Sequence, residues 1–280
     1  MSRQPLFRPL FRPLRTSHCA SHALDRASHA LDRAAPVRHH GTDKQTDRAR
    51  IPLRRPLESP AEARAPRTVD GMTLAQSERA ALADLFDELG PDQPTLCEGW
   101  DTQDLLIHLV LRDGRPDAFA GTIVKPLQGW TDRVAAGYAK RPWSELVQRY
   151  RSGPPVWNPA GWGKLNELTN GGEMFIHHED ARRGQPGWEP RDLDPASVAE
   201  LEKMLGSRVS KLALRKFQVG VVAELPGGRH IPLKSGEPTA TVTGEPGEIV
   251  LWLSGRDAAK VTFTGDDQAV SAVQAGSRGV

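Results

Sequence analysis

The pattern of apolar and polar positions after residue 72 predicts helices first and strands later. The first helix would begin at a capping box formed by Thr73 and Gln76, and Gly90 would end it. Between these signals, apolar residues recur at helical spacing, at Leu74, Ala81, Leu82, Leu85, Phe86 and Leu89. We therefore expect an amphipathic helix that turns one face to a core.

Start and stop signals predict further helices in the middle of the chain. Asp101 or Thr102 can cap a helix that carries the apolar run 105–111. Pro and Gly dominate residues 153–163, which predicts a loop. The remaining predicted helical segments are 116–141, 142–151 and 164–183, the last of them closed by Gly184. Several helices of this kind in succession favour a bundle.

The last third of the chain has a different pattern. Asp194 followed by Pro195 is a helix start, and the apolar pattern continues to about Phe217. Runs that favour strands then alternate with Gly-rich turns, at 239–243, 248–253 and 259–264. We interpret the chain as mainly α, with a helical bundle over 72–190 and a C-terminal helix plus a small β module over 191–280.

Residues 1–71 differ from the rest because they contain short tandem repeats. Leu6–Pro9 recurs as Leu10–Pro13, and Ser21–Ala27 recurs at once as Ser28–Ala34. Arg- and Pro-rich copies of this length cannot bury a core, so we expect a disordered basic leader. It would be a targeting segment, a basic arm for anionic surfaces, or a stretch that precedes the true start at Met72.

Charge and cysteine content narrow the classes of function. The whole chain holds 37 Lys and Arg against 35 Asp and Glu, whereas residues 1–71 hold 14 against 7, so the remainder is acidic. An acidic folded part argues against nucleic acid as a partner. The two cysteines, Cys19 and Cys97, exclude a disulfide framework and suit a reducing cytoplasm. No apolar run is long enough to predict a membrane span.

The candidate chemistry lies in the stretch 170–183. Glu173 and His177 are four residues apart, so a helix would place them on one face, where both can reach one small cation. The third ligand would be His108, from a neighbouring helix of the bundle. Two His and one Glu with a coordination position left open are typical of a catalytic zinc site. A histidine in an apolar stripe is more often a core residue, so the hypothesis depends on all three together.

Other polar residues near these ligands have two interpretations each. Asp180 follows His177 by three residues and could fix its tautomer, with His178 as a second neighbour of the site. The alternative is a charged, exposed helix end. Arg112 or Arg115 could bind a substrate or thiol through a carboxylate, or could lie on a solvated helix face.

Two residues outside this stretch are interpreted as structural. Cys97 lies near a helix start, where a reactive thiol is conceivable, but a half-buried structural cysteine is the simpler interpretation. Gly255 and Arg256 are interpreted as a turn, with a polar contact as the alternative. Neither enters the expected site.

Three motifs occur together around the candidate ligands. They are Leu96–Trp100, His108 eight residues later, and the run that contains Asn170, Glu173, His177, His178 and Asp180. Together they resemble the mycothiol-dependent maleylpyruvate isomerase-like group of DinB-like metal-binding proteins, and within it an uncharacterised actinobacterial subfamily. The resemblance extends over about 72–275 and includes residues 251–266, which are similar to the sterol-carrier-like tail of that family.

The resemblance implies a DinB-like four-helix bundle followed by a small α+β sterol-carrier-like module. It implies a divalent metal, with zinc (Zn2+) the expected ion, on His108, Glu173 and His177, and mycothiol as the thiol cosubstrate at the open position. The implied reaction is an isomerisation or a thiol S-transfer on a small electrophile. The alternative is a non-catalytic metal-binding or small-ligand-binding module, in which His178 would be a fourth ligand. The oligomeric state is left open.

Overall fold

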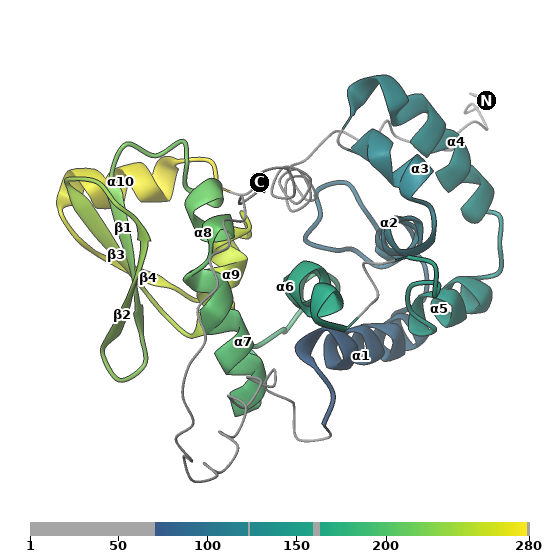
Figure 1. Cartoon of the computed structure of the whole chain (residues 1–280), viewed down its shortest axis with the longest axis horizontal. Coiled ribbons are helices and arrows are strands. Elements are labelled where there is room, and N and C mark those ends of the chain that lie inside the picture. The colour runs from purple at the N-terminus through teal and green to yellow at the C-terminus, as the bar shows by residue number, and fades with distance from the viewer. Residues whose placement is uncertain (1–70, 123, 159–162, 279–280) are drawn as a thin grey trace, which may run out of the picture.

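The elements form two groups that meet at helix α6, which is the last helix of the first group (Figure 1). The computed structural model describes residues 71–122, 124–158 and 163–278, so the predicted leader lies outside the described residues apart from Gly71. The first group consists of α1 (Leu74–Leu89), α2 (Thr102–Gly114), α3 (Pro116–Phe119), the 3-10 turns η1 (Ala120–Thr122) and η2 (Lys125–Leu127), α4 (Gln128–Tyr138), α5 (Trp143–Arg151) and α6 (Gly163–Arg183).

Local sequence signals account for the ends of the first two helices. The Thr73 hydroxyl accepts from the Gln76 backbone N–H at 3.4 Å, and the Gln76 side chain accepts from the Thr73 N–H at 3.1 Å. Gly90 ends α1 with a φ of 74°, which a residue without Cβ adopts readily. Asp101 caps α2 by accepting from the Asp104 N–H at 2.9 Å. The predicted starts of both helices are confirmed.

The other helical predictions for this group are confirmed in part. Helices α5 and α6 match the predicted segments 142–151 and 164–183 to within one residue. The predicted segment 116–141 is instead divided among α3, η1, η2 and α4. The chain folds back closely within it, since a Cβ on Gly121 would lie 2.1 Å from Thr131 Oγ1.

The helices of the first group enclose one apolar core. Helix α1 packs along α6 and also contacts α5, and α2 packs against α5. The largest buried side chains of this core include Phe86, Leu105, Leu109, Leu146, Tyr150 and Met174. Arg79 is buried beside this core and forms a two-point ion pair with Asp113, at 2.5 and 3.0 Å. The buried charge of Arg79 is therefore neutralised by a neighbouring carboxylate inside the protein.

The second group is a small mixed sheet with helices around it. Its elements are α7 (Pro195–Leu205), α8 (Arg208–Ala213), β1 (Gly220–Leu225), β2 (Arg229–Lys234), β3 (Thr239–Thr243), α9 (Pro246–Leu253), β4 (Thr262–Gly265) and α10 (Asp267–Ala275). The strand order is β2-β1-β3-β4; β1 runs antiparallel to β2 and parallel to β3, and β3 runs antiparallel to β4. A mainly helical chain with a small sheet near its end is thus confirmed.

Two predictions for the second group are wrong. Residues 248–253, expected as a strand, belong to helix α9, in which every residue is buried, so the run carries no periodicity that separates helix from strand. The helix expected from Asp194 to about Phe217 is interrupted at Gly206 and Ser207. Ser207 starts a separate helix there, because its hydroxyl accepts from the backbone two residues on at 3.2 Å.

The two groups meet along α6. Leu74 and Phe175 come from the first group but pack in the apolar core of the second. On α6, Gly172 lies directly against Met204 of α7, where a Cβ would come within 2.1 Å of Met204 Cε. The glycine therefore permits the close packing of α7 on α6. One helix thus carries side chains into both cores and positions the residues between them.

None of the described helices combines the length and the apolar character that a membrane crossing requires. The longest of them, α6, has 21 residues and carries charged side chains along its C-terminal half.

Candidate metal centre

Helices α2 and α6 bring two of the predicted ligands into contact. The rings of His108 and His177 have centroids 5.3 Å apart and an interplanar angle of 69°. Trp100 and Phe119 flank the His108 ring, at centroid distances of 5.1 and 5.4 Å. Both histidines are buried. Residues from distant parts of the chain thus meet inside an aromatic enclosure.

The Nε2 atom of His108 is buried and has no hydrogen-bond partner within the described part of the chain. Proteins satisfy most of their buried polar atoms. The described residues hold two other such atoms, Asp132 Oδ1 and Trp252 Nε1, and His108 Nε2 is distinguished by the adjacent His177 ring. Burial, and after it the nearby His177 and Arg112, hold the pKa of His108 well below its usual value. The ring is therefore neutral at physiological pH and keeps a lone pair that can bind a metal ion.

Glu173 lies on the same side of α6 as His177. Its Oε2 atom is 3.7 Å from His177 Nε2 and also 3.7 Å from Arg112 Nε. Arg112 in turn donates from Nη1 to Oδ1 of the buried Asn170. The carboxylate therefore stands between an imidazole and a guanidinium, at distances longer than those of metal coordination.

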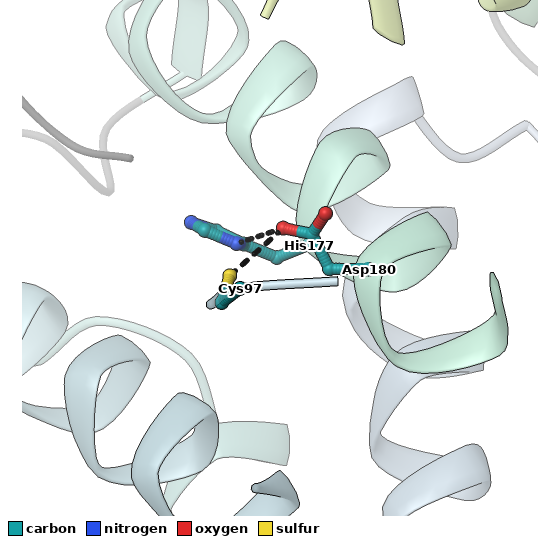
Figure 2. Close-up of side chains that lie close together, drawn as sticks. All are labelled: Cys97, His177 and Asp180. Carbon is teal, nitrogen blue, oxygen red and sulfur yellow. Dashed lines mark hydrogen bonds and ion pairs between the residues drawn. The ribbon is translucent and has the colours of Figure 1, made fainter. Parts of the chain in front are cut away.

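Asp180 binds the opposite edge of the His177 ring (Figure 2). His177 Nδ1 and Asp180 Oδ2 are 3.0 Å apart, and the second ring nitrogen lies at the far end of the ring, away from Asp180 and Cys97. Cys97 Sγ donates to the same Oδ2 at 3.3 Å. Arg256 donates from Nε and Nη2 to the two carboxylate oxygens, at 2.9 and 2.7 Å.

These contacts define the charge of Asp180 and the tautomer of His177. Burial alone would raise the pKa of Asp180, but Arg256 and the hydrogen bond from His177 outweigh it and hold this pKa well below its usual value. Asp180 is therefore a carboxylate that accepts from Nδ1–H, a tautomer assigned from the hydrogen bond. Nε2 is then the ring nitrogen with the lone pair, 3.7 Å from Glu173 Oε2.

His178 points away from these donors. Its Nδ1 lies 2.6 Å from Glu78 Oε2 on α1. Arg191 binds the same Glu78 at 3.0 and 3.1 Å and reaches Glu179 at 2.5 Å. The sequence-based expectation placed His178 beside the metal, or as its fourth ligand. In the structure its Nδ1 is engaged by a carboxylate on another helix.

The contacts of His178 belong to a larger set of matched charges. Arg183 donates to Glu179 at 2.5 Å and to both oxygens of Glu248 on α9, at 2.6 and 2.9 Å. Burial opposes ionisation of Glu179, but Arg191 and Arg183 outweigh it and lower its pKa. We call this set the buried ion network; it consists of Glu78, His178, Glu179, Arg183, Arg191 and Glu248.

Arg115, the second predicted substrate-binding arginine, lies just after α2 and is engaged elsewhere. It forms a two-point ion pair with Asp117, at 2.7 and 2.8 Å, and its guanidinium lies over the Trp130 ring at 6.0 Å. Arg112 contacts Glu173 and Asn170. Of the two arginines, Arg112 is therefore the one that adjoins the candidate ligands.

A second group of donors overlaps the predicted one at His177. Cys97, His177 and Asp180 each offer a ligand atom within 4.8 Å of the others, and the residues that the structure describes contain one such group of three or more. The predicted trio of His108, Glu173 and His177 is not such a group, so its ligand atoms do not all lie within 4.8 Å of one another. Arg256 already neutralises Asp180 and would repel a cation placed beside it. The two edges of one imidazole thus face two different donor sets.

Sequence reasoning assigned no site role to two residues that the structure places at the centre. Arg256, interpreted as a turn residue, is buried and binds Asp180 from the C-terminal part of the chain. No spacing rule reveals such a long-range pair. The sequence could have predicted that Glu78 is buried. It lies four residues from both Leu74 and Leu82, so a helix places it on the same buried face of α1.

Comparison with known proteins found matches among solved structures. No protein-family model matches the chain, and no curated protein matches it. Two solved structures are similar to it, one described as the mycothiol-dependent maleylpyruvate isomerase and the other as a mutant of that enzyme. Both have 16% sequence identity to this chain and cover 70% of it and 93% of their own length, with TM-scores of 0.43 and 0.41.

Proposed function

We propose that the chain binds one divalent metal ion, zinc being the expected ion, through His108, Glu173 and His177. We further propose that it works as an enzyme, a mycothiol-dependent isomerase or thiol S-transferase that acts on a small electrophile in the cytoplasm. The observation that carries the proposal is the buried, unpartnered Nε2 of His108 beside the His177 ring.

The donor set fits a metal with catalytic rather than structural ligation. Two neutral imidazoles and one carboxylate leave a coordination position open, as in catalytic zinc sites. A divalent metal lowers the pKa of a thiol bound at an open position, so that a sulfur nucleophile is available near neutral pH. The choice of mycothiol as this thiol rests on the sequence resemblance around Leu96–Trp100 and residues 170–180.

The side chains around the three proposed ligands have contacts that suggest a role for each. Asp180 holds the Nδ1–H of His177 and so orients Nε2 toward Glu173. Trp100 and Phe119 flank His108 and exclude water from it. Arg112 lies beside Glu173, where a guanidinium can bind an anionic group of the thiol or the electrophile.

The first test is metal content. The purified full-length chain should carry about one zinc ion, and His108→Ala should remove it, as measured by elemental analysis. His230→Ala is the matched control, because the side chain of His230 is 60% exposed on β2. Equal metal content in all three proteins would contradict the proposed ligand set.

The second test concerns the open position. Addition of the thiol to the zinc-loaded protein should add one sulfur ligand at about 2.3 Å in the X-ray absorption spectrum of the metal. A spectrum that does not change on thiol addition would remove the thiol chemistry and leave a metal-binding protein.

A second candidate function is a closed, non-catalytic metal site on the other edge of His177. The close approach of Cys97, His177 and Asp180 favours it, and the Arg256 guanidinium on Asp180 opposes it. Cys97→Ser separates the two candidates, because it removes a ligand from the closed site and none from the open one. Loss of zinc from Cys97→Ser with retention in His108→Ala would establish the closed site.

A further inference from the structure

Arg112 and Glu173 form a second contact between α2 and α6, one helical turn from the two histidines. Arg112 lies one turn after His108 on α2, and Glu173 lies one turn before His177 on α6. The Oε2 atom of Glu173 is 3.7 Å from both Arg112 Nε and His177 Nε2. A cation already stands beside the carboxylate that the proposed metal requires.

We propose that Arg112 is the resident counter-ion of Glu173 in the metal-free protein and competes with the metal for this carboxylate. Arg112 is then a positioning residue that sets metal affinity, and metal uptake exchanges one partner of Glu173 for another. This inference rests on the proposed metal site of His108, Glu173 and His177.

The surroundings make the competition stronger than at an open surface. The side chains of Arg112 and Glu173 are 14% and 27% exposed, so water screens their attraction less than that of a surface pair. Asn170 is buried and accepts a hydrogen bond from Arg112 Nη1. Because this bond anchors the guanidinium, Arg112 remains near Glu173 instead of turning into solvent.

The same geometry opposes the metal in a second way. Arg112 lies one helical turn after His108 on α2, and its Nε is 3.7 Å from Glu173 Oε2, so its positive charge is close to the position that a metal ion would take. That charge would repel a divalent ion held by His108 and Glu173. Both effects act through the charge of residue 112, so a neutral side chain there should bind metal more tightly and a lysine should not.

The test is a zinc titration of the full-length chain against a chromophoric chelator, with Arg112→Gln, Arg112→Lys and Arg115→Gln beside the wild type. Arg115→Gln is the matched control, since it removes the same charge from a neighbouring arginine that pairs with Asp117. We expect the zinc Kd of Arg112→Gln to be about tenfold lower than that of the control, a size typical of a partly buried ion pair. Arg112→Lys should remain near the wild-type value.

The outcomes distinguish this inference from the function on which it rests. If the wild type takes up zinc and Arg112→Gln binds it no more tightly than Arg115→Gln, the counter-ion role is wrong and the metal site stands. If Arg112→Lys binds as tightly as Arg112→Gln, charge is not the cause and the inference also fails. If none of the four proteins takes up zinc, the proposed metal site fails and the counter-ion role with it.

Discussion

The two faces of α6 surround adjacent histidines with opposite kinds of partners. His177 and His178 are both buried, and each has Nδ1 within hydrogen-bond distance of a carboxylate, from Asp180 and Glu78 respectively. Around His178 the buried ion network matches carboxylates and guanidiniums at 2.5–3.1 Å. Around His177 lies His108, whose Nε2 has no hydrogen-bond partner among the described residues.

The difference shows which property distinguishes a candidate site from a structural cluster. Burial of charged side chains does not, since both faces bury them. Shifted pKa values do not either, because Glu179 in the network is shifted as well as Asp180. An unpaired nitrogen beside a second imidazole does: the contacts around His178 are between carboxylates and guanidiniums, whereas His108 Nε2, next to the His177 ring, has no hydrogen-bond partner among the described residues.

The sharpest test of this comparison exchanges each histidine for glutamine. His177→Gln should weaken zinc binding about a thousandfold, because it removes one of three ligands and structural zinc sites bind with about 10–16 kcal/mol in total. His178→Gln should leave the zinc Kd within about fivefold and lower the free energy of unfolding instead. A chelator-competition titration measures the first quantity and urea denaturation the second. Equal loss of zinc in both variants would show that the two faces are not distinct.

The second largest effect should be a loss of stability when the buried ion network around His178 is disrupted. The Arg183 side chain is 1% exposed and binds Glu179 and Glu248. Arg183→Met should therefore cost about 3 kcal/mol of unfolding free energy, because it leaves buried carboxylates short of a partner. Metal content should not change.

Arg182→Met is the control for this variant. Arg182 also binds Glu179, but its side chain is 23% exposed, so its removal should cost less than about 1 kcal/mol. Urea denaturation followed by two spectroscopic probes measures both values. If the two variants lose the same free energy, the network does not depend on burial.

A third, smaller effect should arise where Asp180 orients His177. Asp180→Asn should weaken zinc binding about 10–100-fold, the usual consequence of losing a carboxylate behind a ligating imidazole. Glu179→Gln alters the adjacent carboxylate on the closed face and should leave the zinc Kd unchanged. The chelator titration used for the histidine variants applies here, and an equal change in both variants would exclude the orienting role.

The smallest effect concerns Asp104, one turn before His108 on α2. Burial, and after it the charge of Asp101, raise the pKa of Asp104 to about 6. An acid with a raised folded-state pKa stabilises the fold below its unfolded pKa and loses that contribution as pH rises through about 6. Since the group is partly exposed, solvent screening limits the cost at neutral pH to about 1 kcal/mol or less.

Asp104→Asn should therefore raise the Tm by about 2–4 °C at pH 8, and the gain should shrink toward pH 4. Thermal unfolding at both pH values measures it. A gain that is independent of pH would show that a cause other than ionisation is at work.

Local signals predicted the helices that carry the candidate ligands. The capping box at Thr73 and Gln76 is present in α1, and α6 begins and ends within one residue of its predicted bounds. These features depend on residues within one or two turns, which a sequence pattern contains. The apolar setting of His108 likewise predicted a buried residue on a bundle helix.

Tertiary contacts account for what the pattern did not predict. The run 248–253 is apolar throughout, because α9 is buried on all sides, and only Pro246 at its first turn indicates a helix. Arg256 reaches Asp180 across 76 positions, and Glu78 reaches His178 across 100. Pairing at such separations is determined by how the two groups of elements dock, and no local rule contains it.

Arg256 also ties the candidate metal centre to the C-terminal part of the chain. A fragment that stopped at residue 190 would retain His108, Glu173 and His177, yet Asp180 would remain as a buried anion without its guanidinium. If the proposed metal binds, its occupancy and the docking of the C-terminal elements would then be reciprocally linked. Bound zinc should favour docking of the C-terminal elements, and their undocking should raise the zinc Kd by the same factor.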